Sequence, residues 1–195
     1  MTAFYSEEEL RAFGFRQVGN NVLLSRKVSL YGIQRISIGD SVRIDDFCIL
    51  SAGEGGIELQ DYIHIGPYSA IMGRGKVVLK NFVNISSRVT IYSSNDDYSG
   101  AMMSNPMVPE EYKNVTHADV MLGKHVIVGS GTVILPGVVI GDGCAIGALS
   151  LVSADCPPFT ISAGVPARFI KKRMAAMLEQ EKLLVLATDR RRDSA

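Results

Sequence analysis

The chain has only three cysteines, no net charge and no long uninterrupted apolar run, and each of these features excludes a class of protein. Cys48, Cys144 and Cys156 form an odd set without C-x-x-C spacing, which does not fit a disulfide framework and favours a reducing compartment, the cytoplasm. The 20 basic and 20 acidic residues cancel, so no global field attracts nucleic acid or an anionic membrane. An anionic ligand therefore has to be bound by local groups.

Neither a secretory signal nor a membrane span is expected. The N-terminal segment MTAFYSEEEL carries acidic residues where a signal peptide needs basic ones. The apolar stretch 126–140 is interrupted by Gly129, Ser130, Gly131, Thr132 and Pro136, which is unlike a spanning helix.

An aliphatic residue returns at a fixed spacing of six along most of the chain. The unbroken series is Leu122, Val128, Ile134, Ile140, Ile146 and Val152. The same column occurs earlier as Ile38, Ile44, Leu50, Leu59, Ile65, Ile71, Leu79, Ile85 and Ile91. Its slips fall at the glycine-rich segments 52–56 and 73–76. A six-residue repeat fits a short strand plus a turn, so the chain has to coil and stack its strands around an aliphatic column. A β-sandwich would show period two instead.

The two ends and one internal segment depart from this period. Residues 1–27 predict a helical cap, because Ser6 and Glu9 have capping-box spacing and Gly14 suits a helix end. The β-helix is expected over 28–162, with an inserted loop at 93–119 where the column stops, and so long a loop is typical of a functional segment. The remaining segment, 163–195, is rich in helix formers and predicts a helix over 169–186 followed by a frayed charged tail.

The stretch 120–173, with AGVPAR at 163–168 directly after the last repeats, resembles the hexapeptide-repeat acyltransferases. The resemblance covers residues 36–173 and is closest to the galactoside and maltose O-acetyltransferases and the surface-polysaccharide sugar acetyltransferases. It implies an all-β, left-handed parallel β-helix that forms a homotrimer. It also implies acetyl-CoA as donor, no metal, and active sites between neighbouring subunits.

The resemblance assigns donor-binding positions near the end of the repeats. The residues that match the family's pantetheine positions are Gly129, Ser130, Gly147, Ala148 and Ser153. The residues that match its cations near the CoA phosphates are Arg168, Lys171, Lys172 and Arg173. The alternative interpretation is that small residues merely suit tight corners and that the cations form a solvated helix start.

The catalytic base is where this sequence departs from the family. Family members present a histidine early in the long loop, and alignment puts Asp96 at that position. His64 precedes the column residue Ile65, so its side chain should face outward, and the alignment puts it in the acceptor pocket. The leading hypothesis is that His64 is the base or an acceptor ligand, with Asp96 or Asp97 orienting it or the sugar. The alternative is a surface turn histidine.

The other candidates are weaker. His117, in the loop, is the second candidate for the base, and His125, at a repeat corner, is expected to be structural. The residues expected to bind the acceptor are Asn84, Ser86, Ser87, Arg88, Asn95 and Asp97.

Three classes of function remain open. The favoured one is acetyl transfer to a hydroxyl or amino group of a sugar, in bacterial surface-polysaccharide (O-antigen, capsule or lipopolysaccharide) metabolism. Because an unprotonated amine is already nucleophilic, the missing loop histidine leaves room for an N-acetyltransferase acting on a nucleotide-linked amino-deoxysugar. A zinc carbonic anhydrase on the same helix type needs three converging histidines, whose spacing here is unlike that family's. A silent binding module would bind no CoA.

Overall fold

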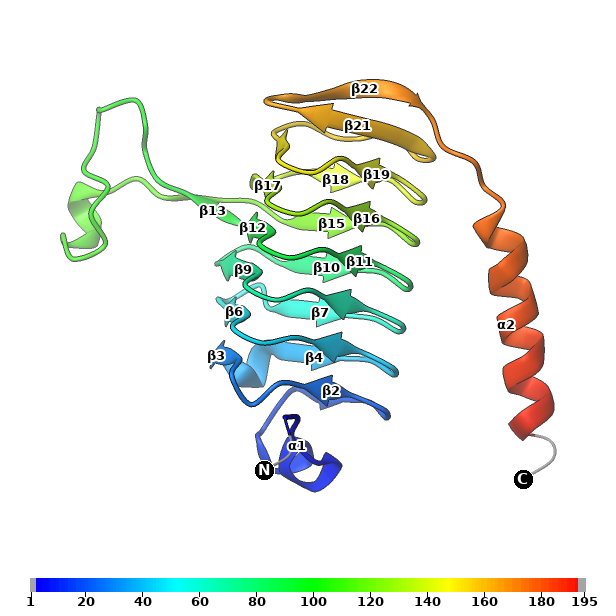
Figure 1. Ribbon diagram of the computed structural model, residues 1–195. Helices are drawn as coiled ribbons and strands as arrows, with labels where there is room; N and C mark the ends of the chain where they lie inside the picture. The colour runs from blue at the N-terminus through cyan, green and yellow to red at the C-terminus, as the bar shows by residue number, and fades with distance from the viewer. Residues whose placement is uncertain (1–2, 193–195) are drawn as a thin grey trace.

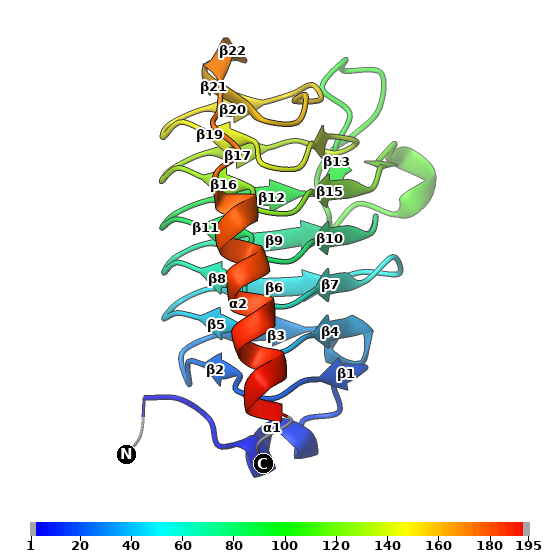
Figure 2. The same cartoon turned by 90° about the vertical axis from the view of Figure 1, so that its right-hand side faces the viewer.

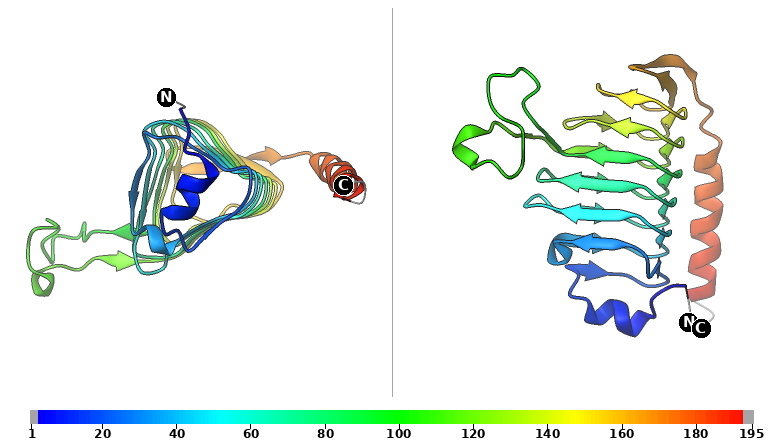
Figure 3. Two further views of the ribbon diagram at one scale, coloured as in Figure 1. Left: turned by 90° about the horizontal axis from the view of Figure 1, so that it is seen from below. Right: turned by 60° about the vertical axis from the view of Figure 1, so that its left-hand side comes forward.

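The protein folds into a three-sided coil in a computed structural model, which describes residues 3–192 (Figure 1). Viewed along its axis the coil is a triangle (Figure 3), and each side is a sheet of parallel strands, to which one antiparallel strand is added at the C-terminal end of the second side. Each strand pairs with the strand one coil earlier, as when Ile85 pairs with Ile65. This confirms the predicted parallel β-helix.

The three sides are named here the first, second and third sheets, in the order in which the chain visits them. The first sheet contains β1 (Gln17–Val18), β4 (Ile36–Ile38), β7 (Ile57–Leu59), β10 (Val77–Leu79), β15 (Val120–Leu122) and β18 (Val139–Ile140). The second contains β2 (Leu23–Leu24), β5 (Arg43–Ile44), β8 (His64–Ile65), β11 (Asn84–Ile85), β16 (Ile127–Val128), β19 (Ala145–Ile146), β21 (Thr160–Gly164) and β22 (Ala167–Lys172). The third contains β3 (Ser29–Tyr31), β6 (Ile49–Ala52), β9 (Ala70–Gly73), β12 (Thr90–Tyr92), β17 (Val133–Ile134) and β20 (Leu151–Val152).

The hexad column forms the core. Every residue of the predicted column is at most 3% exposed, from Ile38 to Val152. A second buried row, including Val83, Val126 and Val138, fills the rest of the coil. Burying one such aliphatic side chain contributes about 1.5–3 kcal/mol, so stacked columns can hold a coil whose individual strands are only two to six residues long.

The sheets meet at three corners, where the backbone must turn sharply. At the first corner, between the first and second sheets, Ser41, Tyr62 and Phe82 have positive φ; at the second corner, between the second and third sheets, Phe47 and Tyr68 do. The predicted slips fall at the third corner, where Gly56 (φ 79°) and Gly73 (φ 137°) take conformations that favour glycine.

The N-terminal end closes the coil with α1 (Glu7–Ala12), below the first strands (Figure 1). The expected capping box is present, since Glu9 N–H donates to Ser6 Oγ and Ser6 N–H donates to Glu9 Oε2. The coil itself starts earlier than residue 28, because β1 and β2 already pair with β4 and β5 inside the segment assigned to the cap.

The loop at 93–119 leaves at the third corner and projects away from the coil (Figures 1 and 3). Its stem is an antiparallel pair, β13 (Ser94–Asn95) with β14 (Thr116–His117), and a short 3-10 helix, η2 (Glu110–Tyr112), lies in its outer part. A second 3-10 helix, η1 (Ile33–Arg35), precedes β4.

The C-terminal prediction was wrong at its start. Residues 167–172 form β22, antiparallel to β21, because the last strand of the second sheet needs a partner for its edge. The helix α2 begins only at Met177 and runs to Arg192, alongside the coil and back towards α1 (Figure 2). Most of the tail expected to fray is therefore helical; residues 193–195 of that tail lie outside the described residues.

Candidate active site

His64 lies in an exposed polar row on the outer face of the second sheet. Its Nε2 is 2.8 Å from Asp45 Oδ2, and its Nδ1 is 3.2 Å from Asn84 Oδ1. Because a carboxylate only accepts, Nε2 carries a proton. Partial burial raises the pKa of Asp45, but hydrogen bonds from His64 and Arg43 outweigh it, and this pKa lies below its ordinary value. Both ring nitrogens of His64 are thus engaged within the row.

The stem of the loop holds the second group of predicted residues. His117 Nδ1 lies 2.8 Å from Ser94 Oγ, across the β13–β14 pair. Asn95 donates to the Asp96 carbonyl at 3.1 Å. The Asp96 side chain is exposed, and within residues 3–192 its carboxylate makes no hydrogen bond or ion pair. Asp96 is therefore available to a ligand.

Asp97 holds the loop in shape. Its Oδ1 accepts from Ser99 N–H at 2.8 Å, and its Oδ2 accepts from Met102 N–H at 2.9 Å. The Ser99 side chain is the main cause that lowers the pKa of Asp97, followed by the hydrogen bond from the Ser99 backbone N–H. Because backbone amides engage both carboxylate oxygens of Asp97, its carboxylate is less available to a ligand than that of Asp96.

One chain does not bring His64 and the loop carboxylates together. The second sheet is the side of the triangle that does not meet the third corner, where the loop leaves (Figure 3). Asp45, which the sequence reading missed, takes the place proposed for Asp96 or Asp97 beside His64. The strand register could have revealed this contact, because Arg43, His64 and Asn84 are paired in successive coils and Asp45 lies two residues after Arg43. The slip in the repeat at 52–56 obscured that register in the sequence.

Gly129, Ser130, Gly147 and Ala148 lie at the second corner, whereas Ser153 directly follows β20, at the other end of the third sheet. Ser87 Oγ donates to Ser130 Oγ at 3.3 Å, which joins the coil before the loop to the coil after it. A Cβ on Gly129 would lie 2.4 Å from Ala148 N, and one on Gly147 would lie 2.7 Å from Ala163 Cβ. Close stacking of coils therefore requires both glycines. Ala148 and Ser153 are exposed.

The predicted cations separate into two kinds. Arg168, Lys171 and Lys172 are exposed on β22. Arg173 instead donates from one guanidinium nitrogen to the carbonyls of His125, Gly143 and Cys144 at 3.0–3.2 Å. Arg173 thus fixes the chain between β22 and α2.

His125 joins α2 to the coil. Its ring stacks on Phe82, with centroids 4.7 Å apart, and its Nε2 lies 2.7 Å from Glu181 Oε2. Lys124 also donates to Glu181, at 3.0 Å. These hydrogen bonds, first that of His125, lower the pKa of Glu181. The His125 side chain is only 12% exposed, as a structural role requires.

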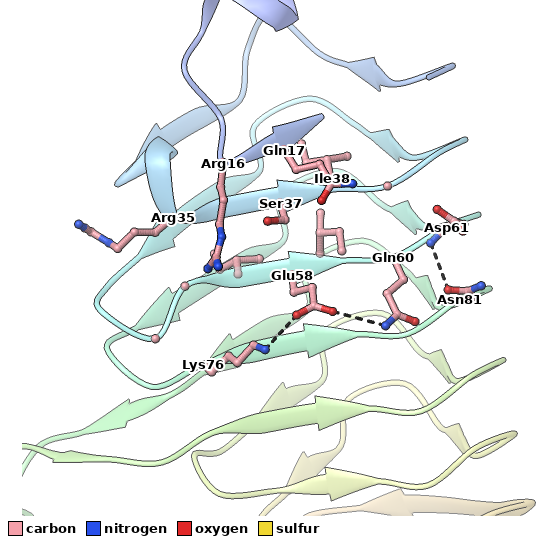
Figure 4. Close-up of a pocket in the computed structure, with 15 residues that line it drawn as sticks. Arg16, Gln17, Arg35, Ser37, Ile38, Glu58, Gln60, Asp61, Lys76 and Asn81 are labelled. Atoms are coloured by element: carbon pink, nitrogen blue, oxygen red, sulfur yellow. Dashed lines mark hydrogen bonds and ion pairs between the residues drawn. The ribbon is translucent and has the colours of Figure 1, made fainter. Parts of the chain in front are cut away.

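A separate polar hollow of about 400 Å³ lies on the first sheet (Figure 4). Lys76 pairs with Glu58 at 2.9 Å, Gln60 donates to Glu58 at 3.4 Å, and Asn81 accepts from Asp61 N–H at 3.3 Å. None of the site residues expected from the sequence lines it. Its polar groups largely satisfy one another.

Two further searches covered the described part of the chain. Residues 3–192 contain no cluster of three or more His, Cys, Asp or Glu side chains that could hold a metal ion. No helix among them is long and apolar enough to cross a membrane.

Comparison with known proteins decides the family. Residues 119–154 match the family described as bacterial transferase hexapeptide (six repeats). The dTDP-4-amino-4,6-dideoxy-D-glucose acyltransferase of Escherichia coli is 55% identical over 179 residues, which cover 92% of this chain and 93% of that protein. The chain belongs to the hexapeptide-repeat acyltransferases. Within this family it is also 31% identical, over 71% of its length and 69% of the relative's, to the putative lipopolysaccharide biosynthesis O-acetyl transferase WbbJ of Escherichia coli strain K12.

A solved member of the family has nearly the same fold. AntD, an N-acyltransferase from Bacillus cereus solved with dTDP and 3-hydroxybutyryl-CoA, superimposes with a TM-score of 0.91 and 45% identity. The match covers 97% of this acyltransferase and 100% of AntD.

Proposed function

We propose that this enzyme transfers the acyl group of an acyl-CoA to the amino group of a dTDP-linked amino-dideoxysugar. The observation that carries the proposal is the 55% identity, over almost the whole of both chains, to an acyltransferase of such a sugar. The similarity to AntD, whose serine variants have been solved with dTDP-4-amino-4,6-dideoxyglucose and coenzyme A, supports it. A role in surface-polysaccharide metabolism, in the cytoplasm, is part of the proposal.

The loop chemistry fits an amine acceptor better than a hydroxyl. An amine attacks a thioester carbonyl without first losing a proton, whereas a hydroxyl needs a base. The amine nitrogen bonds to the acyl carbon, the carbon–sulfur bond breaks, and the proton released by the nitrogen passes to the CoA thiolate. The products are an amide and CoA thiol. In this step the Asp96 carboxylate accepts a hydrogen bond from the amine and orients it.

A serine works with this aspartate in the proposed site. The solved AntD variants replace a serine or an aspartate that are ten positions apart in AntD. Two pairs with that spacing include an aspartate of the loop, Ser86 with Asp96 and Ser87 with Asp97, whereas a third, Ser51 with Asp61, lies within the coil. Because the Asp97 carboxylate already holds Ser99 and Met102, the free carboxylate of Asp96 favours the first pair.

The donor is proposed to lie along the second corner. Ser87, Ser130 and Ala148 would face the pantetheine arm, and the close-packed Gly129 and Gly147 would line the same groove. Ser153, beyond β20, is the predicted donor position that lies outside this groove. Arg168, Lys171 and Lys172 would pair with the CoA phosphates, since among the described side chains, those of residues 3–188, no acid offsets them.

His64 is proposed as an acceptor ligand within this site, together with Asn84, Arg88 and Asn95. Its Nε2 proton is directed to Asp45 and its Nδ1 faces Asn84, so a base role would require breaking a contact of the row. His117 stays the second candidate for a base.

A homotrimer with sites between subunits completes the proposal. Ser86 lies at the second corner and Asp96 beyond the third, and from Arg88 to Ser94 the chain runs along the third sheet for about 20 Å at about 3.3 Å per residue. A neighbouring copy can bring its loop to the second corner. The neighbouring copy could also cover a set of exposed apolar residues, namely Phe169, Ile170, Leu183, Leu184, Val185 and Leu186.

The reaction is tested by thiol release from acetyl-CoA and 3-hydroxybutyryl-CoA with three acceptors. These are dTDP-4-amino-4,6-dideoxyglucose, its 4-hydroxyl counterpart and a free galactoside. Turnover with the amino sugar alone is expected. Turnover with the galactoside or the hydroxyl compound would contradict the proposal in favour of O-acetylation, and no thiol release at all would favour a silent binding module.

The shared site is tested by mixing inactive variants. Ser86→Ala and Asp96→Asn chains, each carrying a different tag, are co-expressed and purified through both tags. If one site uses Ser86 of one copy and Asp96 of its neighbour, mixed trimers regain part of the activity. Mixed trimers as inactive as the parents, or a monomeric mass in solution, would contradict the arrangement.

A further inference from the structure

An exposed ladder of rings and cations runs down the second corner, below the proposed donor groove. Phe47 and Tyr68 stack with centroids 5.0 Å apart and an interplanar angle of 23°. The Arg88 guanidinium lies 5.4 Å from the Tyr68 centroid, and Lys27 Nζ lies 5.1 Å from that of Phe47. Phe47 is 46% exposed and Tyr68 is 54% exposed. Such large exposed rings in one column indicate a ligand surface.

This ladder is continuous with the groove above it. Arg88 follows Ser87, whose hydroxyl contacts Ser130 and whose carbonyl accepts from Gly131 N–H at 3.1 Å. Successive coils are about 4.8 Å apart, so Phe47 lies two coils, about 10 Å, below Arg88. That length suits the part of a nucleotide sugar that extends from the sugar through the diphosphate to the base.

The charges along the ladder are unequal. Lys27 pairs with Asp46 at 2.7 Å, and Arg43 pairs with Asp45 at 2.7 Å. Arg88 lies over a ring, but among the described side chains, those of residues 3–188, it has no acidic partner. A guanidinium that is left without a carboxylate, at the level between donor groove and rings, is suited to a diphosphate.

A hollow of about 540 Å³ opens beside the lower rungs of the ladder. Its lining includes Phe47, Tyr68 and Arg43. Arg43 donates to Asp45 from Nε, and its side chain is 53% exposed, so its other guanidinium N–H groups can donate to a carbonyl oxygen at the imide edge of thymine.

The first corner shows what a purely structural ladder looks like. Tyr62 stacks on Phe82 and Phe82 stacks on His125, and Glu181 of α2 closes the upper end of this ladder. No cation without an acid stands on it, because Lys124 pairs with Glu181. The two ladders therefore differ in charge, and α2 contacts the upper end of the one on the first corner.

We propose that Phe47, Tyr68 and Arg88 form a nucleotide ledge that binds the thymidine diphosphate part of the acceptor. The thymine base packs against the exposed rings, with a carbonyl oxygen of its imide edge towards Arg43, and Arg88 pairs with the diphosphate. This rests on the proposed function, because the acceptor there carries dTDP. It adds where the nucleotide binds and which residues select it.

The test measures the binding of dTDP to the full-length protein by titration calorimetry, in the absence of CoA. Tyr68→Ala should raise the Kd for dTDP about tenfold, while Tyr68→Phe leaves it within about twofold. Arg88→Ala should weaken dTDP binding about tenfold and thymidine binding much less. Tyr62→Ala, the matched ring on the first corner, should change neither, and all four variants should keep the wild-type Kd for CoA.

The two proposals fail in different ways. A wild-type protein that binds no dTDP would overturn the proposed acceptor. A wild type that binds dTDP with an affinity unchanged by Tyr68→Ala and Arg88→Ala, or weakened as strongly by Tyr62→Ala, would overturn the nucleotide ledge and leave the acceptor proposal standing.

Discussion

In the coil, side chains alternate between a buried aliphatic column and an outer row, whereas in the loop at 93–119 nearly every side chain faces solvent. Of these loop residues, all of which the structure describes, Ser93 is the one buried as a whole residue, and the Lys113 side chain is 6% exposed where its Nζ donates to Glu110 and to the Pro106 carbonyl. The coil gains stability by burial, and the loop is held by local hydrogen bonds such as those of Asp97. The comparison teaches that scaffold and acceptor chemistry are built separately, so substitutions in the two regions should fail differently.

The largest effect is expected in the coil. Ile140→Ala removes a fully buried side chain and should destabilise the protein by about 2–5 kcal/mol. Val139→Ala, on the outer face of the same strand and 37% exposed, is the matched control and should cost far less. Urea denaturation at one fixed protein concentration measures both. Equal losses would contradict the inner column as the source of stability.

Neighbouring aspartates sharpen the contrast within the loop. Asp96→Asn should lower kcat on the order of a hundredfold and leave the urea midpoint unchanged, because its carboxylate has no structural partner. Asp97→Asn should instead speed proteolysis of the loop, since it weakens the contacts to Ser99 and Met102. A wild-type rate for the Asp96 variant would contradict a role for Asp96 in the active site.

His64 tests whether the outer row of the coil takes part in catalysis or in binding. His64→Ala should raise KM for the acceptor about tenfold and keep kcat within about threefold, as expected for the loss of one ligand hydrogen bond. His125→Ala is the control histidine and should loosen α2 without changing KM. A hundredfold fall in kcat at unchanged KM would assign His64 as the base instead.

The cations of β22 should act on the donor alone. Reversing Lys171 and Lys172 to Glu is expected to raise the Kd for CoA about tenfold at low salt, with a smaller effect at high salt because exposed charges are screened. Lys182→Glu, on the exposed face of α2, is the control. A Kd that stays at the wild-type value would place the CoA phosphates elsewhere.

The smallest effect concerns the docking of α2. His125 and Lys124 hold the pKa of Glu181 below its ordinary value of 4.5. A depressed carboxyl pKa contributes stability that is complete above the ordinary value and is lost as pH falls through the folded value. Proteolysis of α2 should therefore accelerate between about pH 5 and pH 3. In Glu181→Gln this acceleration should be much weaker, and an identical profile would contradict the contact.

Periodicity predicted the coil well because burial is a local consequence of position in the repeat. A residue such as Ile134 points inward wherever it occurs in its hexad, so the core could be read without a partner. The structure at the end of the chain could not be predicted in this way. The segment 169–186 as a whole is rich in helix formers, yet β21 leaves an unpaired edge that residues 169–172 satisfy as part of β22. Tertiary pairing overrode propensity there.

The site was predicted in its parts and not in its arrangement. Asp96 was singled out by its position in the loop, but Asp45 was missed because its contact with His64 spans one coil across a slip in the repeat. Likewise, no pattern separates Asp96 from Asp97, although one carboxylate is free and the other is bound to two amides.

The sequence by itself determined the coil, its inner column, its capping helix and the place where the loop leaves, because each follows from residues close together in the chain. Tertiary structure alone decided which polar residues meet. Stacking coils brings together residues about twenty positions apart, as in the rows Arg43–His64–Asn84 and Phe47–Tyr68–Arg88. The contacts in those rows depend on the register between coils, and a single glycine-rich slip is enough to shift that register.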